Sequence, residues 1–314
     1  MASSAFIAGD WGTSHLRLNL CDRAGNIIES KKGPGVGAVK ADVAGAFFSQ
    51  IESWNHYGAL PAVLCGMVGS TIGWREVRYL PCPIDPETIP AGTMQFNVNG
   101  RAIAIAPGIS CRNRLQGPDV MRGEETQILG ALRLEPKLAE GHHVLCMPGT
   151  HTKWVSLKDG VIEHFLTAIS GELYDILFRH SVLVNSKDSV DGIGGPAFKR
   201  ALEKTKLYPD GELIHLLFEV RSGQLNGELK QRDAADYLSG LIIGQDVSGA
   251  RRFFRNDLAE SDGVVVISTP HLGALYVEAL RTREITTHQV DGDAASLAGL
   301  HALYGALEVA ENAA

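Results

Sequence analysis

A strand, a short polar turn and a second strand occur twice in this chain, once near the N-terminus and once near its middle. The first copy is GDWGTSHLRL, from Gly9 to Leu18, and the second is MPGTHTKW, from Met147 to Trp154. Each copy is followed by another strand pattern and then by a helical pattern, so the order of elements restarts near residue 143. The amino-acid identity between the two halves is too low to establish a sequence repeat. The repeated order alone predicts two similar α/β units.

Hydrophobic periodicity predicts the elements of both halves. Strands are expected within 6–20 on both sides of the first turn and over 26–30, 61–67, 101–105, 143–147, 154–157, 161–168 and 263–268. Helices are expected over 44–54, 120–133, 171–180, 234–252, 273–282 and 294–307. We therefore expect an N-terminal lobe over residues 1–140, joined by the C-terminal helix 294–307, and a C-terminal lobe over residues 141–293.

Composition excludes several classes of protein. The 314 residues, 45% of them hydrophobic, can bury a core in each of two domains. The five cysteines form no CxxC pair, which predicts reduced thiols in a cytoplasmic protein without a zinc site. A net charge of −7 with no long basic stretch argues against nucleic acid as a partner. No apolar run has the length of a membrane span and no basic leader opens the chain, so membrane insertion and secretion are not expected.

The first turn has the composition of a phosphate-binding site. Successive backbone amides of Gly12, Thr13 and Ser14 can form a concavity that binds anions. Asp10, at the end of the preceding strand, is placed to hold Mg²⁺ beside a phosphate. The alternative is that Gly12 only makes the turn and Asp10 hydrogen-bonds to it.

The second turn offers similar groups. Gly149, Thr150 and Thr152 supply amides and small hydroxyl side chains, and Lys153 supplies a cation. His151 can donate a hydrogen bond to a phosphate, or it can be a solvated turn residue. Two such turns at equivalent positions favour nucleotide binding over two unrelated structural turns.

Five motifs occur in the order found in 2-dehydro-3-deoxygalactonokinases, and the chain resembles that family from about residue 6 to residue 304. PDVMRGEETQ and PGTHTKW are its specific motifs, since DWGT fits many sugar kinases. The five are DWGT (10–13), GMVGS (66–70) followed by Gly73 and Trp74, PDVMRGEETQ (118–127), PGTHTKW (148–154) and SGELY (170–174).

The resemblance implies two ribonuclease H-like lobes of the sugar kinase, Hsp70 and actin type, with an interdomain cleft that holds ATP and Mg²⁺. It also implies phosphorylation of the 6-hydroxyl of 2-dehydro-3-deoxy-D-galactonate in galactonate catabolism. In the family plan the first hairpin meets the γ-phosphate in a substrate lobe, and the second meets the remaining phosphates in a nucleotide lobe.

Phosphoryl transfer to an alcohol needs a carboxylate that orients the hydroxyl and accepts its proton. Asp119, near the start of the helix expected over 120–133, resembles the aspartate that sugar kinases use there. Its alternative is an N-cap that binds the amides of Met121 or Arg122. Glu124 and Glu125 are the other candidates for this role. Their alternatives are supporting Mg²⁺, pairing with Arg122, or lying on a solvated face.

A sugar acid also needs a cation for its carboxylate. Arginine offers a planar bidentate fork, although an isolated arginine is usually a surface ion pair. Arg17 and Arg75 are favoured by their positions beside the turn and beside GMVGS. The full set of candidate arginines is Arg17, Arg75, Arg78, Arg112 and Arg122.

The remaining predicted contacts follow from the motifs. Gly66, Met67 and Ser70 of GMVGS would let sugar hydroxyls approach the backbone, and Glu124 joins them as a substrate contact. The alternative is that GMVGS only forms a turn. For adenosine, the family has a Gly-Ser type turn after the last apolar strand, where this chain has Ser268 and Thr269. Gly273 or the small Ser268 can replace the missing glycine.

Two other functions stay open from the residues. One is a kinase for another sugar or sugar acid, such as 2-dehydro-3-deoxygluconate, because few hydrogen bonds separate epimers. The other is an ATP-switch protein of the actin or Hsp70 type, since fold alone does not decide function. A homodimer is the default expectation for assembly.

Overall fold

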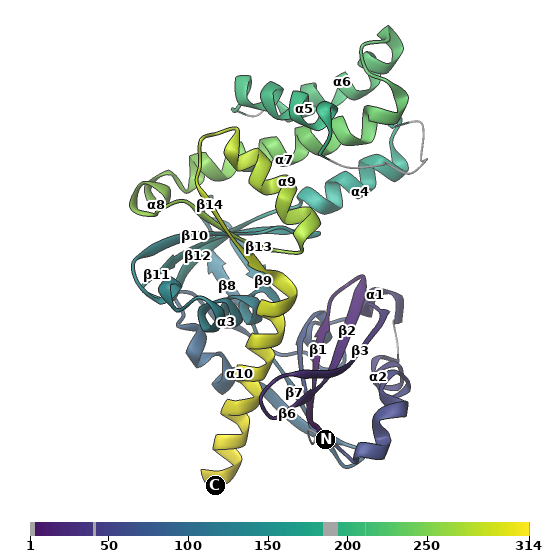
Figure 1. The fold of residues 1–314 in the computed structure, drawn as a ribbon, viewed down its shortest axis with the longest axis vertical. Helices are drawn as coiled ribbons and strands as arrows, with labels where there is room; N and C mark the ends of the chain where they lie inside the picture. Colours follow the sequence, from purple (N-terminus) through teal and green to yellow (C-terminus); the bar gives the residue numbers. More distant parts are fainter. Residues whose placement is uncertain (1–3, 40–41, 185–193, 211, 314) are drawn as a thin grey trace. The chain divides into compact units, whose positions relative to one another are not determined.

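The computed structural model describes residues 4–39, 42–184, 194–210 and 212–313 (Figure 1). The chain forms two compact units, which are described separately. Unit 1 comprises Met1–Gly141, Lys158–His164 and Gly292–Ala314, and unit 2 comprises His142–Leu157 and Phe165–Asp291.

The main sheet of unit 1 has six strands in the order β3-β2-β1-β4-β7-β6. β1 pairs with β2 antiparallel and with β4 parallel, and β4 pairs with β7 parallel. Its strands are β1 (Ser4–Trp11), β2 (His15–Asp22), β3 (Ile27–Pro34), β4 (Ala62–Gly66), β6 (Met94–Val98) and β7 (Arg101–Ile105). The short helices between them are α1 (Val36–Val39), α2 (Val43–Ile51), η1 (Glu52–Tyr57), η2 (Met67–Gly69) and η3 (Pro86–Gly92).

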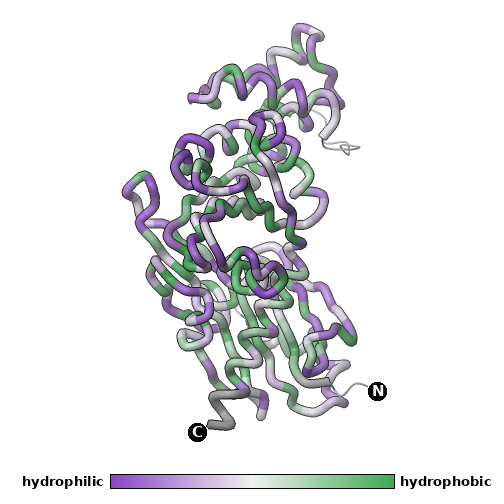
Figure 2. The backbone as a smooth tube through the Cα atoms, turned by 60° about the vertical axis from the view of Figure 1, so that its left-hand side comes forward, coloured by the Kyte–Doolittle hydropathy of each residue, from purple (hydrophilic) through white to green (hydrophobic). Residues whose placement is uncertain are grey.

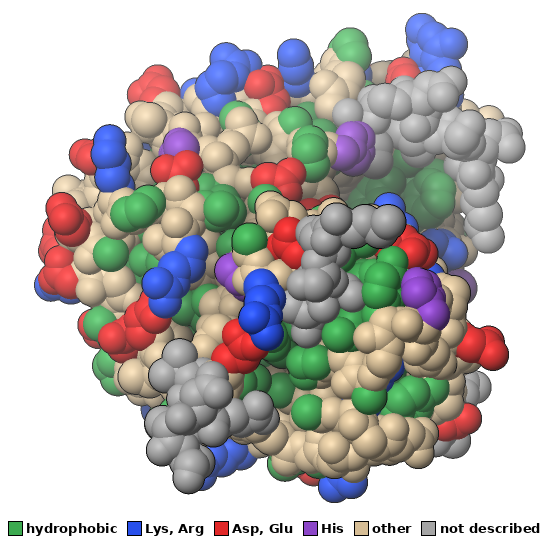
Figure 3. All heavy atoms as spheres, turned by 60° about the horizontal axis from the view of Figure 1, so that its bottom comes forward, with side chains coloured by type: hydrophobic (Ala, Val, Ile, Leu, Met, Phe, Trp, Pro, Cys, Tyr) green, Lys and Arg blue, Asp and Glu red, His purple; other side chains and the backbone are tan. Residues whose placement is uncertain are grey.

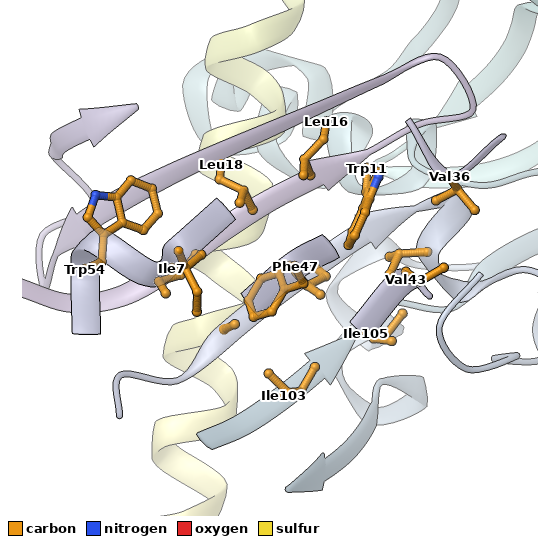
Figure 4. Packing of buried hydrophobic residues seen from close by; sticks show 14 of the residues in the cluster. Ile7, Trp11, Leu16, Leu18, Val36, Val43, Phe47, Trp54, Ile103 and Ile105 are labelled. Atoms are coloured by element: carbon orange, nitrogen blue, oxygen red, sulfur yellow. The ribbon is translucent and has the colours of Figure 1, made fainter. Parts of the chain in front are cut away.

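Alternation along β1 sends its side chains to opposite faces of this sheet. Ile7 and Trp11 point to the face covered by α2, where Phe47 is fully buried (Figure 4). Burying one such aromatic side chain stabilises the fold by about 2–3 kcal/mol. The even-numbered residues face the other way, so Phe6 stacks on Tyr304 of the last helix, with ring centroids 4.3 Å apart. Asp10 shares that second face.

A smaller sheet, in the order β5-β8-β9, leads into the helix of the PDVMRGEETQ motif. Its strands are β5 (Tyr79–Pro81), β8 (Gly108–Arg112) and β9 (Pro118–Met121), and the elements that follow are α3 (Glu124–Leu134) and η4 (Pro136–Ala139). The helix expected over 120–133 is therefore wrong at its start. Gly123 has a φ of 108°, a conformation that favours glycine and ends the strand before the helix can begin. Asp119 consequently lies in a strand and is not an N-cap.

The last helix, α10 (Gly292–Ala313), packs on α3 within unit 1. A Cβ built on Gly130 of α3 would lie 1.8 Å from the carbonyl oxygen of Ala295, and one on Gly299 of α10 would lie 2.0 Å from that of Thr126. The two helix backbones therefore touch at these glycines.

The sheet of unit 2 has the order β12-β11-β10-β13-β14, which matches β3-β2-β1-β4-β7 of unit 1 position by position. β10, β13 and β14 pair in parallel. The strands are β10 (His142–Met147), β11 (Thr152–Lys158), β12 (Val161–Ala168), β13 (Val264–Ser268) and β14 (Thr287–Asp291). The repeated strand order confirms the predicted fold class of two ribonuclease H-like units.

Unit 2 also contains a group of helices inserted between β12 and β13 (Figure 1). They are α4 (Ser170–His180), α5 (Pro196–Leu207), α6 (Leu213–Asn226), η5 (Gln231–Asp233), α7 (Ala234–Phe253) and α8 (Arg255–Glu260), and α9 (Pro270–Arg281) follows β13. α5 and α6 pack on α7 around the fully buried Leu238 and Leu241. Sequence periodicity did not predict α5 or α6.

Hydropathy and charge follow this arrangement. Hydrophobic colouring is concentrated along the strands in Figure 2, whereas the helices mix both kinds of residue. On the face drawn in Figure 3, Lys and Arg side chains are scattered among Asp and Glu. In the described part of the chain, no helix is both long and apolar enough to cross a bilayer.

Candidate functional site

The first hairpin turn lies between β1 and β2 and is closed by its own backbone. The amide of Gly12 donates to the carbonyl of His15 at 2.9 Å, so this amide is already used. The turn is then fixed from outside, because the amide of Gly37 donates to the carbonyl of Thr13 at 3.0 Å. Among the described residues, no backbone acceptor takes the amides of Thr13 and Ser14, and both residues are exposed. These two amides can therefore bind an anion.

Asp10 is the second-last residue of β1, close to this turn, and its side chain faces α10. Its Oδ2 accepts a hydrogen bond from the Ser296 hydroxyl at 3.3 Å and lies 4.0 Å from Nη1 of Arg17. Burial raises the pKa of the Asp10 carboxyl, and this effect outweighs the opposing effects of Arg17 and Ser296. Glu124 and Asp293 add smaller upward shifts of the pKa. A cation bound at Asp10 would stabilise its ionised form.

The residues present at Asp10 fit a nucleotide-bound Mg²⁺. Within the described ranges, no group of three or more His, Cys, Asp and Glu side chains is arranged to hold a metal ion. Mg²⁺ in phosphoryl-transfer sites usually has one or two carboxylate ligands and takes the rest from phosphates and water. One carboxylate beside an anion-binding turn matches that pattern.

Two glycines bring the GMVGS and PDVMRGEETQ motifs to Asp10. Parallel pairing of β1 and β4 places Asp10 opposite Cys65 and Trp11 opposite Gly66. A Cβ on Gly66, whose φ is 86°, would lie 2.8 Å from the Trp11 carbonyl oxygen and 3.5 Å from Oδ1 of Asp10. A Cβ on Gly123 would lie 3.4 Å from the Cα of Gly66. The first turn of α3 therefore starts next to Asp10.

Two glutamates occupy that first turn. Oε2 of Glu124 accepts a hydrogen bond from the Arg122 amide at 3.1 Å. Glu125 is fully buried, and its two oxygens accept from the Gly123 amide at 2.6 Å and the Thr126 hydroxyl at 2.9 Å. Burial, with a further contribution from Glu124, raises the pKa of Glu125 to about 8. Glu125 is therefore a buried carboxyl group that titrates near neutral pH.

Asp119 lies in β9 opposite Cys111 of β8. Its Oδ2 accepts a hydrogen bond from the Asn113 side-chain amide at 3.1 Å, and its Oδ1 accepts from the Val120 amide at 2.9 Å. The side chain is partly exposed. Asp119 is thus held by its own hairpin, with some of its surface open to solvent.

Four of the five candidate arginines are already engaged or open to solvent. Arg17 forms an ion pair with Asp293 at 2.9 Å. Arg75 stacks over Phe96, with its guanidinium carbon 4.4 Å from the ring centroid. The exposed ones are Arg75, Arg78 and Arg112.

Arg122 differs from them. Its Nη2 donates to the Val77 carbonyl at 2.6 Å, and its guanidinium lies 4.4 Å over the Tyr79 ring. Its Nε and Nη1 are buried and have no hydrogen-bond partner among the residues that the structure describes. A Cβ on Gly69 would lie 2.8 Å from Nη1, so the GMVGS segment covers this arginine. Two donors of Arg122 are therefore unsatisfied beneath the predicted substrate motif.

Within GMVGS itself, Ser70 is used by the local turn. Its hydroxyl donates to the carbonyl of Met67 at 2.7 Å, and only 8% of the residue is exposed. Of the groups expected to meet sugar hydroxyls here, the Ser70 hydroxyl is thus already engaged.

The second hairpin turn lies between β10 and β11 and packs against the start of α4. The Glu172 amide donates to the Thr150 carbonyl at 2.9 Å, and a Cβ on Gly171 would lie 2.3 Å from the Gly149 carbonyl oxygen. Because the N-terminus of a helix favours anions, α4 adds to the anion-binding character of this turn. His151 is not simply solvated, since its Nε2 lies 2.5 Å from Oε2 of Glu172.

The residues that follow this turn are buried. Thr152 is fully buried, and its hydroxyl lies 2.8 Å from the hydroxyl of Tyr276. Lys153 is 4% exposed, so its side chain lies inside the protein and not on an open turn. At the end of β13, the Ser268 hydroxyl is buried with no partner in the described parts of the chain. Thr269 is the N-cap of α9 without a side-chain capping bond.

Sequence reasoning missed Ser296 and Asp246. Both are polar residues within helices that are otherwise rich in apolar and small residues, and that contrast was the available signal. Ser296 contacts Asp10, and Asp246 of α7 accepts hydrogen bonds from Trp154, Ser170 and Tyr276.

Two α/β units with one strand order, each with a polar hairpin at its first strand, define the fold of the sugar kinase, Hsp70 and actin superfamily. A family model described as 2-keto-3-deoxy-galactonokinase matches residues 10–303. The chain belongs to this family, as its motifs predicted. It is thus a phosphotransferase with an alcohol group as acceptor.

Relatives support this assignment. The chain is 37% identical to the "Probable 2-dehydro-3-deoxygalactonokinase" of Rhizobium meliloti strain 1021, over 95% of both chains. It is 31% identical to the 2-dehydro-3-deoxygalactonokinase of Escherichia coli K12, over 96% of this chain and 98% of that one. A crystal structure titled "putative 2-dehydro-3-deoxygalactonokinase protein" from Sinorhizobium meliloti superposes with a TM-score of 0.84 at 36% identity, over 96% of both chains.

Proposed function

We propose that this protein uses ATP to phosphorylate the 6-hydroxyl of 2-dehydro-3-deoxy-D-galactonate by direct in-line transfer. The observation that carries the proposal is Asp10, a partly buried carboxylate beside a turn whose Thr13 and Ser14 amides have no backbone acceptor among the described residues. This combination suits a phosphate with its metal ion. The family and its relatives supply the substrate class.

The two turns divide the phosphates between them in this proposal. Thr13 and Ser14 bind the γ-phosphate, and Gly12 shapes that turn. Gly149 and Thr150 form the second grip, with the N-terminus of α4 adding to it, whereas Thr152 and Lys153, which the sequence predicted to join it, are buried. Ser268 and Thr269 border the adenosine, where the unsatisfied Ser268 hydroxyl is an available hydrogen-bonding group. The placement of ATP in a cleft between the two lobes stays a prediction.

Asp10 is the proposed ligand of Mg²⁺, directly or through water. The ion supplies positive charge that offsets the charge of the phosphates during transfer. Ser296 and Arg17 hold the Asp10 side chain toward α10, and ionisation of Asp10 is favoured once a cation is present.

The proton of the substrate hydroxyl is assigned to Asp119. The Asn113 side-chain amide and the Val120 amide donate hydrogen bonds to its carboxylate and orient it, and a positioned carboxylate can accept the proton of a hydroxyl. Glu124 is the first alternative, because it lies in the turn of α3 that starts next to Asp10. Glu125 is less suited, since it is fully buried, whereas Asp119 is partly exposed.

The substrate carboxylate is assigned to Arg122. Its unsatisfied Nε and Nη1 are two separate donors of a charged guanidinium, either of which can bind a carboxylate oxygen, and reaching them requires the overlying GMVGS segment to move. Arg17 and Arg75, together with Gly66, Met67, Ser70 and Glu124, complete the proposed substrate set. Arg17 is the weaker choice because Asp293 already neutralises it.

A coupled assay for ADP release with a panel of sugar acids tests the proposal. We expect 2-dehydro-3-deoxygalactonate to give the highest kcat/KM, above its gluconate epimer and above neutral hexoses. Faster turnover of the gluconate epimer or a hexose would replace the substrate. ATP hydrolysis indifferent to every acid would favour an actin-like or Hsp70-like switch protein. Cytoplasmic location, a role in galactonate catabolism and a homodimer remain predictions.

A further inference from the structure

A single carboxylate connects four elements of unit 2 around the second hairpin. Asp246 lies toward the C-terminal end of α7. Its Oδ1 accepts a hydrogen bond from Nε1 of Trp154 at 2.8 Å, and its Oδ2 accepts from the hydroxyls of Ser170 and of Tyr276, the latter at 2.7 Å. These donors belong to β11, α4 and α9. Asp246 therefore joins α7 to three separate elements.

The donors surround the turn from both sides. Trp154 lies on the strand that leaves the turn, and Thr152 on the same strand reaches Asp246 indirectly, since its hydroxyl contacts that of Tyr276 at 2.8 Å. Alternation places the side chains of Thr152 and Trp154 on one face of β11. Two consecutive inward-facing residues of the strand are thus fixed to one carboxylate.

The third donor fixes the start of α4. Ser170 is the first residue of this helix, and Gly171 follows it in contact with Gly149 of the turn. Because glycine at 171 leaves no space between α4 and the turn, a shift of the helix start would move the turn. Burial raises the pKa of Asp246, while the three donors oppose that shift and favour the ionised form.

We propose that Asp246 is a positioning residue for the ATP phosphates, which holds the β10–β11 turn and the N-terminus of α4 in one fixed geometry. This inference rests on the proposed function, in which that turn binds phosphate. Asp246 acts through Thr152, Trp154 and Ser170 and does not itself touch the nucleotide. Small displacements of such supporting groups reduce phosphoryl transfer because the geometry of the phosphates must be held closely.

The test compares Asp246→Asn and Tyr276→Phe with the unaltered full-length protein. Asparagine keeps the shape but loses the charge, and phenylalanine removes only the hydroxyl that links Thr152 to Asp246. We expect KM for ATP to rise about 10-fold or more in Asp246→Asn and about 3-fold or more in Tyr276→Phe. KM for the sugar acid should stay within about twofold, because its proposed contacts lie in unit 1. Asp246→Glu keeps the charge, so its affinity for ATP should lie between that of Asp246→Asn and that of the unaltered protein.

Ser156→Ala is the matched control. Ser156 lies on the same strand, is 1% exposed, and donates its hydroxyl to the buried Asp257 at 2.7 Å. Its loss should lower the melting temperature as much as Tyr276→Phe does while leaving KM for ATP unchanged. The inference would be overturned if Asp246→Asn, Tyr276→Phe and Ser156→Ala all lowered the melting temperature equally and all left KM for ATP unchanged.

Calorimetric titration of ATP into each protein distinguishes failure of the inference about Asp246 from failure of the proposed function. Unaltered protein that turns over the sugar acid while the variants keep native ATP affinity contradicts only the role of Asp246. Unaltered protein that binds ATP but does not phosphorylate the acid contradicts the proposed function, and the ATP affinities of the variants still decide the role of Asp246. Unaltered protein that binds no ATP contradicts both.

Discussion

The hydroxyl of Ser296 donates a hydrogen bond to Oδ2 of Asp10 at 3.3 Å, although 286 positions separate the two residues in the chain. The contact forms because the even-numbered side chains of β1 face α10, which packs on that side of the sheet. The last helix thus completes the surroundings of a residue at the first turn. Substitutions near the C-terminus can therefore alter the first hairpin.

Asp10→Asn should lower kcat/KM by about 10²-fold or more, because the amide loses the charge that holds a cation beside the phosphates. Steady-state kinetics at varied Mg²⁺ measures this. Ser296→Ala is the milder comparison and should cost less than about 10-fold. Full activity of Asp10→Asn at ordinary Mg²⁺ would remove the metal-binding role from this residue.

Asp119→Asn should lower kcat by about 10²-fold or more with ATP affinity retained, since only the proton acceptor is lost. Glu124→Gln and Glu125→Gln are measured alongside it by the same kinetics. A larger loss of kcat in Glu124→Gln than in Asp119→Asn would move the proton acceptor to Glu124.

Arg122→Gln should reduce kcat/KM for the sugar acid by about 10–100-fold, because the carboxylate loses a charge-assisted hydrogen-bond partner. Arg122→Lys should recover part of that loss, since lysine keeps the charge without the planar guanidinium. Arg112→Gln is the control, because Arg112 is exposed and its Nη1 donates to the Gln116 carbonyl. Equal effects of the two glutamine variants would remove the assignment.

Glu125 should make unfolding depend on pH. In the folded protein the Glu125 carboxyl has a pKa of about 8, whereas a glutamate in water has a pKa of about 4.5. Its contribution to stability is therefore complete below about pH 4.5 and declines as the pH rises toward 8. Glu125→Gln cannot lose a proton, so its free energy of unfolding relative to the native protein should increase over this range, by on the order of 1–4 kcal/mol. Urea denaturation at several pH values measures the difference, and a constant difference would show that Glu125 does not titrate there.

Gly299→Ala should destabilise the protein by about 1–3 kcal/mol, because the added methyl group would overlap the Thr126 carbonyl oxygen at 2.0 Å. Gly305→Ala in the same helix is the control, since its Cβ would meet no atom within 4 Å. That substitution should be neutral or stabilising by up to about 1 kcal/mol, as alanine is the better helix former. Thermal melts compare the two, and similar melting temperatures would mean that the helices separate easily at this contact.

The elements that sequence predicted well are those with local signals. Alternation around the Gly12 turn and the apolar run of β4 define their own structure. The start of α3 was misplaced because β9 depends on pairing with β8 and because Gly123 adopts a positive φ, neither of which periodicity contains.

The candidate site was predictable only in part for a related reason. The turn residues near Asp10 and Thr150 follow from motif order, which is a property of the chain. Partners from remote helices, such as Ser296 and Asp246, depend on how those helices pack. Likewise, Arg17 looked available in sequence because its ion pair with Asp293 is formed across the fold.

The glycine contact between α3 and α10 leaves no flexible side chain at the crossing. An added methyl group at Gly130 or Gly299 must therefore displace a whole helix. Glu124 is the first residue of α3 and Ser296 the fifth residue of α10, so such a displacement alters the neighbours of Asp10. Two glycines at a helix crossing thereby limit how far the amino-acid sequence can diverge before the surroundings of the first hairpin are lost.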